Sequence, residues 1–327
     1  MLPATGAILA YLNARLGISY DLSLLSAYIQ TRNRLAALDR RDELNLFYVL
    51  ECFAVGRPNA NVDVSKTAEL VFMVFRNREW TFKQTYETVL KYGTWFKTQL
   101  GVRSGDIVAV DFMNGDIFVF IWFGLWAIGA KPAFVNYNVT GASLVHCVRA
   151  SAARILLVDP ELALPPSVVG ELASGGEKRN HTENTVSSVK TVIFSSELEQ
   201  EILTTDAIRQ PDEERADQKP SDMAALIFTS GTTGLQKPAV ISWVKAGIAS
   251  LFVSNYMSLS ADDRLYTVSM KCISVYNRDS ELSLSHDTAK PSFTLLANGT
   301  FSVCLFTIQL QLLLVSAPLF KEGALYA

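Results

Sequence analysis

Histidine and cysteine, the residues that most often bind transition metals, are scarce in this chain. It contains three histidines and four cysteines among 327 residues. The cysteines lie far apart, so no two of them have the short spacing that a zinc site requires. They are Cys52, Cys147, Cys272 and Cys304. We expect reduced, buried thiols in an intracellular protein.

A surplus of positive charge is also missing. Lysine and arginine total 29 against 32 acidic residues, and the net charge is −3. Bulk electrostatics therefore gives no attraction to nucleic acid, and we expect no nucleic-acid partner. Hydrophobic residues nevertheless make up 49% of the chain, which leaves contact with a membrane open.

No processing signal opens the chain, by our interpretation. The apolar stretch 2–12 has no basic region before it, and the charged residues Arg15 and Asp21 come soon after it. The stretch is also too short to span a bilayer unaided. The last three residues do not form a peroxisomal signal.

Residues 1–50 are predicted to be mostly helical and to form a segment apart from the rest. Four arginines alternate there with leucines: Arg32, Arg34, Arg40 and Arg41. A basic, amphipathic helix of this kind can lie in the surface of a membrane. It can equally be an ordinary solvated helix that packs on the domain, and both interpretations stay open.

Strands and helices alternate through the middle of the chain. The expected strands cover 70–75, 107–112, 132–135, 154–158 and 191–194. Thr81 with Gln84 predicts a capping box at a helix start, and the uncharged run 117–130 fits a buried helix. We expect 163–190 to be loop-like and 212–214 to be a solvated acidic face. The alternation predicts an α/β fold with mainly parallel sheets flanked by helices.

The most informative stretch is a loop between two β-prone runs. Its hydroxyl, glycine and lysine residues are Thr229, Ser230, Gly231, Thr232, Thr233, Gly234 and Lys237. Glycines let consecutive N–H groups turn toward one anion, hydroxyls add donors, and Lys237 brings a positive charge. The Walker A pattern fails, because Lys237 comes three residues after Gly234 and precedes Pro238. The stretch predicts a polyphosphate-binding loop; the alternative is an ordinary turn between strands.

The order of this loop resembles the phosphate loop of the adenylate-forming superfamily, which includes acyl-CoA synthetases and luciferases. Other stretches narrow the resemblance to the fatty acid transport proteins, also called very-long-chain acyl-CoA synthetases, and to their fungal branch. These stretches are Trp80–Phe82, Gly101–Asp106, Ile121–Trp126, Gly129–Asn138, Leu144–Cys147 and Lys237–Trp243. The resemblance implies the large N-terminal domain of the adenylate-forming fold, incomplete toward its C-terminal side.

The resemblance also implies a reaction, the activation of long or very long fatty acids. The carboxylate attacks ATP to give an acyl-adenylate and pyrophosphate, and the CoA thiol then displaces AMP, with Mg²⁺ spreading the phosphate charge. Residues 229–234 and Lys237 would hold the β- and γ-phosphates, and Gln236 replaces the proline usual before this lysine. It further implies coupling to fatty acid uptake at an intracellular or plasma membrane: endoplasmic reticulum, peroxisome, lipid droplet or plasma membrane.

Beyond Met270 the sequence departs from the family. Residues 271–292 form a polar tract, and 301–320 form an apolar segment with two glutamines near its middle. We hypothesise a retained intron or faulty gene model, which sequencing of the transcript would test. The family's downstream motifs are not identifiable, so we assign no catalytic or metal-binding residue. The expected domains are a helical segment 1–50, a partial AMP-binding domain 51–270 and a divergent tail 271–327.

Two kinds of function remain. The first is an AMP-forming acid–CoA ligase, in a truncated form that is weakly active or inactive. The second is a non-catalytic, membrane-associated remnant that binds lipid, and a ligase for another carboxylic acid is a further alternative. His146 and Cys147 suggest a nucleophile, but no acidic partner stands near them in sequence. We expect both to be structural.

Overall fold

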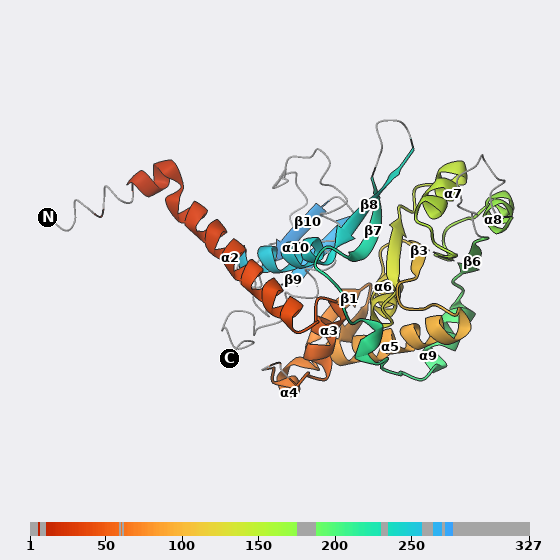
Figure 1. Cartoon of the computed structure of the whole chain (residues 1–327), viewed down its shortest axis with the longest axis horizontal. Coiled ribbons are helices and arrows are strands. Elements are labelled where there is room, and N and C mark those ends of the chain that lie inside the picture. Colours follow the sequence, from red (N-terminus) through yellow and green to blue (C-terminus); the bar gives the residue numbers. More distant parts are fainter. Residues whose placement is uncertain are drawn as a thin grey trace.

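A six-stranded sheet runs through the middle of the molecule (Figure 1). The computed structural model describes residues 6, 11–58, 60, 62–174, 188–229, 235–256, 264–269 and 272–276. The strand order is β6–β5–β3–β4–β7–β8, parallel throughout except for the antiparallel pair β7 and β8. The strands are β3 (Ile107–Asp111), β4 (Lys131–Val135), β5 (Ile155–Val158), β6 (Lys190–Ile193), β7 (Met223–Thr229) and β8 (Lys237–Ser242). The predicted α/β fold with a mainly parallel sheet is confirmed.

Helices cover both faces of this sheet. From β3 the chain crosses through α6 to β4 on one side, and from β4 it returns through α7 to β5 on the other. Right-handed crossovers in opposite directions place these two helices on opposite faces. The helices around the sheet are α5 (Phe82–Gln99), α6 (Asp116–Ala127), α7 (Gly141–Ala150), α8 (Pro166–Ala173) and α9 (Ser196–Thr204). Contacts of α5 with α6 and α9, and of α7 with α8, show the two layers.

Each face of the sheet has its own core. Val108 and Val110 of β3 belong to the larger core, which α5 and α6 cover, and Ala109 between them belongs to the smaller core under α7. This alternation follows from the two-residue period of a strand. Buried on both faces, the central strands consist almost entirely of apolar residues, as parallel strands do.

Helix α6 is the centre of the larger core. Trp122 and Trp126 are fully buried, and Trp126 Nε1 donates a hydrogen bond of 2.8 Å to the carbonyl oxygen of Ala224 in β7. Helix α6 approaches α5 closely at Gly93 and Gly124, where a Cβ on Gly93 would lie 3.1 Å from the Gly124 oxygen. The prediction that the uncharged run forms a buried helix is confirmed.

Helix α5 begins as predicted. The Thr81 hydroxyl accepts a hydrogen bond of 3.2 Å from Gln84 N, and the Gln84 side chain accepts one of 3.0 Å from Thr81 N. Before this helix, β1 (Val71–Phe75) and β2 (Arg78–Thr81) form a separate antiparallel hairpin. The sequence predicted β1 but missed β2, because β2 is short and only its pairing with β1 makes it a strand.

Two segments have regular structure that we did not predict from the sequence. Residues 163–190 contain α8, which starts with Pro166 in its first turn and buries Val168 and Leu172. The start of the polar tract forms β10 (Cys272–Tyr276), which pairs with β9 (Arg264–Ser269). Proline is compatible with the first turn of a helix, which the loop prediction ignored. Residues 277–327, including the apolar segment 301–320, lie outside the described residues.

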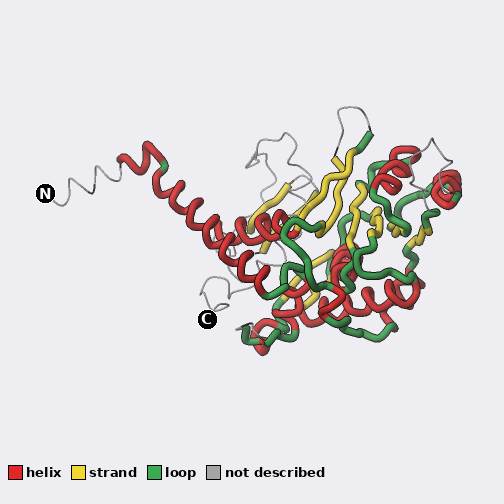
Figure 2. The backbone as a smooth tube through the Cα atoms, in the orientation of Figure 1, coloured by secondary structure: helices red, strands yellow, loops and turns green. Residues whose placement is uncertain are grey.

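The N-terminal segment is helical as predicted. Helix α2 (Ile18–Arg40) packs its C-terminal half on α10 (Trp243–Tyr256), where Leu35 lies against Gly247. Its N-terminal half projects from the body in Figures 1 and 2, and Leu22 and Leu25 are 60% and 53% exposed. Among the described residues, no helix combines the length and apolar content needed to cross a bilayer.

A partly buried ion cluster joins α3 (Phe47–Ala54) to the connection after α9. The Glu51 carboxylate accepts hydrogen bonds from Arg57, Arg209 and Tyr86, and Asp212 of η1 (Asp212–Glu214) accepts from Arg209. None of residues 212–214 is buried, as predicted for a solvated acidic face, but that prediction missed the ion pairs of Asp212. The three arginines around Asp212, which include the fully buried Arg215, tie this segment to the domain.

Candidate phosphate-binding site

The candidate site lies where β7 ends and β8 begins. Thr229 and Lys237 face each other in the antiparallel register, and Thr229 Oγ1 donates a hydrogen bond of 3.3 Å to the Lys237 carbonyl oxygen. Lys237, expected in the loop, is the first residue of β8, and its side chain is exposed. The predicted phosphate-binding residues between them, Ser230, Gly231, Thr232, Thr233 and Gly234, lie outside the described residues.

This hairpin lies at the carboxyl edge of the parallel sheet. β7 is parallel to β4, so Thr229 follows the same edge as Val135 and Asp111 at the ends of β4 and β3. At that edge β3 continues into α6 on one face, whereas β4 continues into α7 on the other. Ligands of open α/β sheets bind at such a reversal of direction. The fold thus places Thr229 and Lys237 at the edge where a ligand is expected.

Helix α7 holds the residue before Lys237 through two hydrogen bonds. His146 Nε2 lies 3.0 Å from the Gln236 carbonyl oxygen, and Cys147 Sγ donates to Gln236 Oε1 at 3.3 Å. A carbonyl oxygen only accepts, so His146 carries a proton on Nε2. We predicted that both residues are structural but named no residue that they contact. The contact was missed because about ninety positions separate α7 from Gln236.

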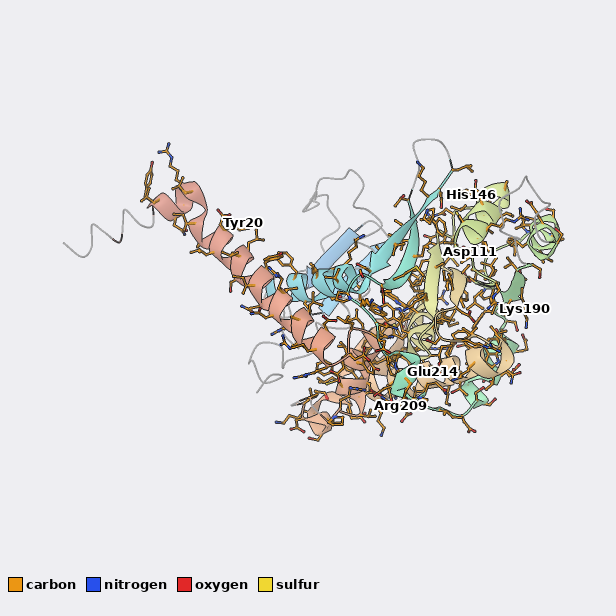
Figure 3. All side chains as sticks on the ribbon, viewed as in Figure 1. Tyr20, Asp111, His146, Lys190, Arg209 and Glu214 are labelled. Atoms are coloured by element: carbon orange, nitrogen blue, oxygen red, sulfur yellow. The ribbon has the colours of Figure 1, made fainter. Side chains whose placement is uncertain are left out.

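A buried carboxyl group stands at the same edge. Asp111 is 3% exposed, and its Oδ1 has no hydrogen-bond partner among the described residues. Burial, and then the charge of Asp159, raises the pKa of Asp111 to about 7. Burial, and then the charge of Asp111, raises the pKa of Cys147 to about 11. Figure 3 labels Asp111 and His146 at this end of the sheet.

The described residues do not build a metal site. Within the described ranges, no group of three histidine, cysteine, aspartate or glutamate side chains is placed to hold a metal ion. Asp159, the acidic neighbour of Asp111, uses its carboxylate to accept hydrogen bonds from the backbone N–H groups of Met113 and Glu161. We therefore assign no metal ligand.

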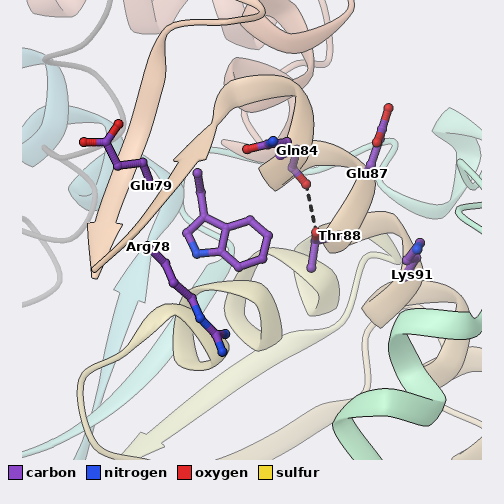
Figure 4. A pocket seen from close by; sticks show the side chains of 7 residues that line it. Arg78, Glu79, Gln84, Glu87, Thr88 and Lys91 are labelled. Atoms are coloured by element: carbon purple, nitrogen blue, oxygen red, sulfur yellow. Dashed lines mark hydrogen bonds between the residues drawn. The ribbon is translucent and has the colours of Figure 1, made fainter. Parts of the chain in front are cut away.

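A surface pocket of about 380 Å³ lies elsewhere, over β2 and the start of α5 (Figure 4). Trp80 forms one wall, and its Nε1 donates a hydrogen bond of 3.3 Å to Asp116. Charged and polar side chains line the rest, among them Arg78, Glu87 and Lys91. None of the lining residues belongs to the β7–β8 hairpin, so this pocket is separate from the candidate site.

The sequence of the chain agrees with one family along most of the described domain. The family described as AMP-binding enzyme matches residues 61–276. The chain belongs to this AMP-binding enzyme family. The match covers the whole six-stranded sheet, the β7–β8 hairpin and β10, so it extends beyond Met270, where we expected the family resemblance to end.

Two relatives of this chain are named as fatty acid transport proteins. The chain is 28% identical over 274 residues to a very long-chain fatty acid transport protein of Cochliobolus heterostrophus, covering 83% of this chain and 39% of the relative. It is 32% identical over 201 residues to the protein of that name in Saccharomyces cerevisiae, covering 59% and 28%. The predicted resemblance to fatty acid transport proteins is confirmed. The chain spans well under half of the length of these relatives.

Solved structures support the fold of this AMP-binding domain. An anthranilate CoA ligase in complex with anthranoyl-AMP superposes with a TM-score of 0.50 at 20% sequence identity. The superposition covers 66% of this chain and 38% of the ligase. This likeness confirms that the described residues have the fold of the N-terminal domain of adenylate-forming ligases.

Proposed function

We propose that this chain belongs to an AMP-forming fatty acid–CoA ligase and contributes the part that grips the ATP phosphates. In the proposed reaction a long or very long fatty acid attacks the α-phosphate of ATP, pyrophosphate leaves, and the CoA thiol then displaces AMP. The observation that carries the proposal is the position of Thr229 and Lys237 at the carboxyl edge of the sheet, in a family of AMP-binding enzymes. The names of the relatives support the fatty acid as substrate.

The residues present fit a polyphosphate. The Lys237 ammonium is exposed at the edge, with no ion pair among the described residues, so it is available to phosphate oxygens. The Thr229 hydroxyl, now donating to the Lys237 carbonyl, can turn to a phosphate oxygen instead. We propose that Ser230, Gly231, Thr232, Thr233 and Gly234 supply further donors. Mg²⁺ would arrive with ATP and neutralise part of the phosphate charge, and CoA would accept the acyl group.

Equilibrium ATP binding tests this proposal. Lys237→Ala should weaken binding at least about tenfold, because a charge-assisted hydrogen bond contributes about 1.5–3 kcal/mol. Lys190→Ala is the matched control: it removes an exposed lysine at the amino end of β6, the opposite edge of the same sheet. Equal affinities of the two variants, or no binding of ATP by the unchanged chain, would contradict the proposal.

We further propose the domain limits 51–270 for the AMP-binding part and 271–327 for a divergent tail, with little acyl-CoA made by the 327-residue polypeptide alone. A thioester assay with oleate and a very long-chain acid checks the second point. Rapid turnover by the purified chain would show that the catalytic residues we could not identify are present. A preference for aromatic or short acids would favour a ligase for another carboxylic acid.

Membrane association, with coupling to fatty acid uptake, is a second proposal, and one observation favours it. Leu22, Leu25 and Ile29 are exposed on the part of α2 that projects from the body. Such side chains can enter the interface of a membrane. Co-sedimentation with phosphatidylcholine vesicles should fall when Leu22 and Leu25 are changed to serine. It should not fall in the control Ile208→Ser, which alters a 50% exposed residue elsewhere. Vesicle binding without ATP binding would favour the non-catalytic, lipid-binding alternative.

A further inference from the structure

Gln236, the residue directly before Lys237, is hydrogen-bonded to helix α7 through both its main chain and its side chain. Its carbonyl oxygen accepts from His146, and its Oε1 accepts from Cys147. The side chain is half-buried, whereas Lys237 next to it is exposed. The two bonds therefore fix the peptide unit from which β8 and Lys237 start.

The partner thiol has little freedom of its own. Cys147 is 0% exposed and packs in the smaller core with Val145 and Val148 on either side along α7. A solvent reagent reaches its sulfur only when Gln236 or α7 moves, because the Gln236 amide lies against that sulfur. Access to the Cys147 thiol consequently reports on the position of Gln236.

We propose that Gln236 is a positioning residue that couples the Cys147 thiol to nucleotide binding at Lys237. This inference rests on the proposed function. When Gln236 is held by α7, Lys237 starts β8 in register with Thr229 and faces the phosphates. When the Gln236 contact opens, the register of Lys237 loosens and the thiol is uncovered. ATP favours the held state, and a group attached to the thiol favours the open state.

Thermodynamic linkage makes the coupling reciprocal. If ATP stabilises the held state, it must protect Cys147, and blocking Cys147 must weaken ATP binding by the corresponding factor. A neutral hydrogen bond contributes modestly to such an equilibrium, so we expect effects of about two- to tenfold. These are smaller than the effect expected for Lys237→Ala, which removes a charge that contacts the ligand.

The experiment measures both directions on the full chain. Native-state alkylation by iodoacetamide, followed at each cysteine by peptide mass spectrometry, should slow at Cys147 when ATP is added. Cys52, buried in α3, is the internal control and should not change.

ATP affinity should fall about two- to tenfold in Cys147→Ala and in Gln236→Ala. It should be restored in Cys147→Ser, which keeps a donor. The double variant should lose no more than either single one.

The outcomes separate this inference from the proposed function. ATP binding that leaves Cys147 alkylation unchanged, or additive losses in the double variant, would overturn the coupling and leave the phosphate site intact. Absence of ATP binding in the unchanged chain would overturn the proposed function and the coupling together. Thermal melting of each variant shows whether it is folded. A loss of affinity in Cys147→Ser equal to that in Cys147→Ala would also contradict a role for the hydrogen bond.

Discussion

Gly129 lies directly against the main-chain carbonyl of Glu214, so a Cβ at position 129 would fall far inside van der Waals contact with that oxygen. Gly129 also has a φ of 74°, in the left-handed region that favours glycine. We expect Gly129→Ala to destabilise the fold by several kcal/mol, on the order of 3, because backbone strain and overpacking add. Urea unfolding measures this loss.

Gly170→Ala is the control for that substitution. Gly170 lies inside α8, and a Cβ there would meet no atom within 4 Å. Alanine in place of glycine inside a helix stabilises by up to about 1 kcal/mol. Opposite signs for the two glycines are the expected result, and equal small effects would show that the connection carrying Glu214 adjusts freely.

Glu51 should be a main contributor to the stability of the N-terminal half. Its carboxylate is 2% exposed and accepts from Arg57, Arg209 and Tyr86. Glu51→Gln removes the charge from between two arginines, and the loss should be about 3 kcal/mol, since Arg209 is partly exposed and can regain water. Asp63→Asn, which weakens an exposed pair with Lys66, should have a much smaller effect on stability.

The lowered pKa of Glu51 predicts how the stability of the protein depends on pH. Burial alone would raise the pKa of Glu51, but hydrogen bonds from Arg209 and then Arg57 outweigh it and hold the pKa below its usual 4.5. The ionised form is thus favoured by folding. The contribution is complete above pH 4.5 and is lost as the pH falls through the lower folded-state pKa. Unfolding curves of Glu51→Gln should lack this acid-side loss.

Asp111 should behave in the opposite way. Burial, and then Asp159, raises its pKa to about 7 from 3.8, so folding favours the neutral form. The contribution of Asp111 to stability is therefore greatest below pH 3.8 and falls as the pH rises toward about 7. Asp111→Asn should therefore gain stability over the unchanged protein by about 1.4 kcal/mol per pH unit in that interval, and level off above it. A difference that does not vary with pH would contradict the raised pKa.

Local features of the sequence predicted a large part of the fold. The capping box of Thr81 and Gln84, and the uncharged run that became α6, depend on residues a few positions apart, so the sequence displays them directly. Strand β2 becomes a strand only through its pairing with β1, and the ion pair of Asp212 with Arg57 joins residues 155 positions apart. A pattern within one segment cannot contain that information.

The candidate site also has some features that the sequence predicts and others that it does not. The composition around Thr229 and Lys237 predicted a polyphosphate-binding loop, and its ligand-binding residues remain a prediction. The contact of Gln236 with His146 and Cys147 could not be predicted, because it requires α7 and β8 to be brought together by the sheet. The one local sign was the glutamine in place of the family's proline, since glutamine has a side-chain oxygen that can accept from the thiol and proline has none.

The two cores on either side of the sheet differ in one optical property. All the tryptophans, Trp80, Trp95, Trp122, Trp126 and Trp243, lie in the larger core or pack against it, and the smaller core under α7 has none. Intrinsic fluorescence will therefore follow the melting of the α5–α6 layer and stay silent to rearrangements beside α7. Nucleotide titrations need calorimetry or a labelled nucleotide, and a flat emission signal would carry no information about binding.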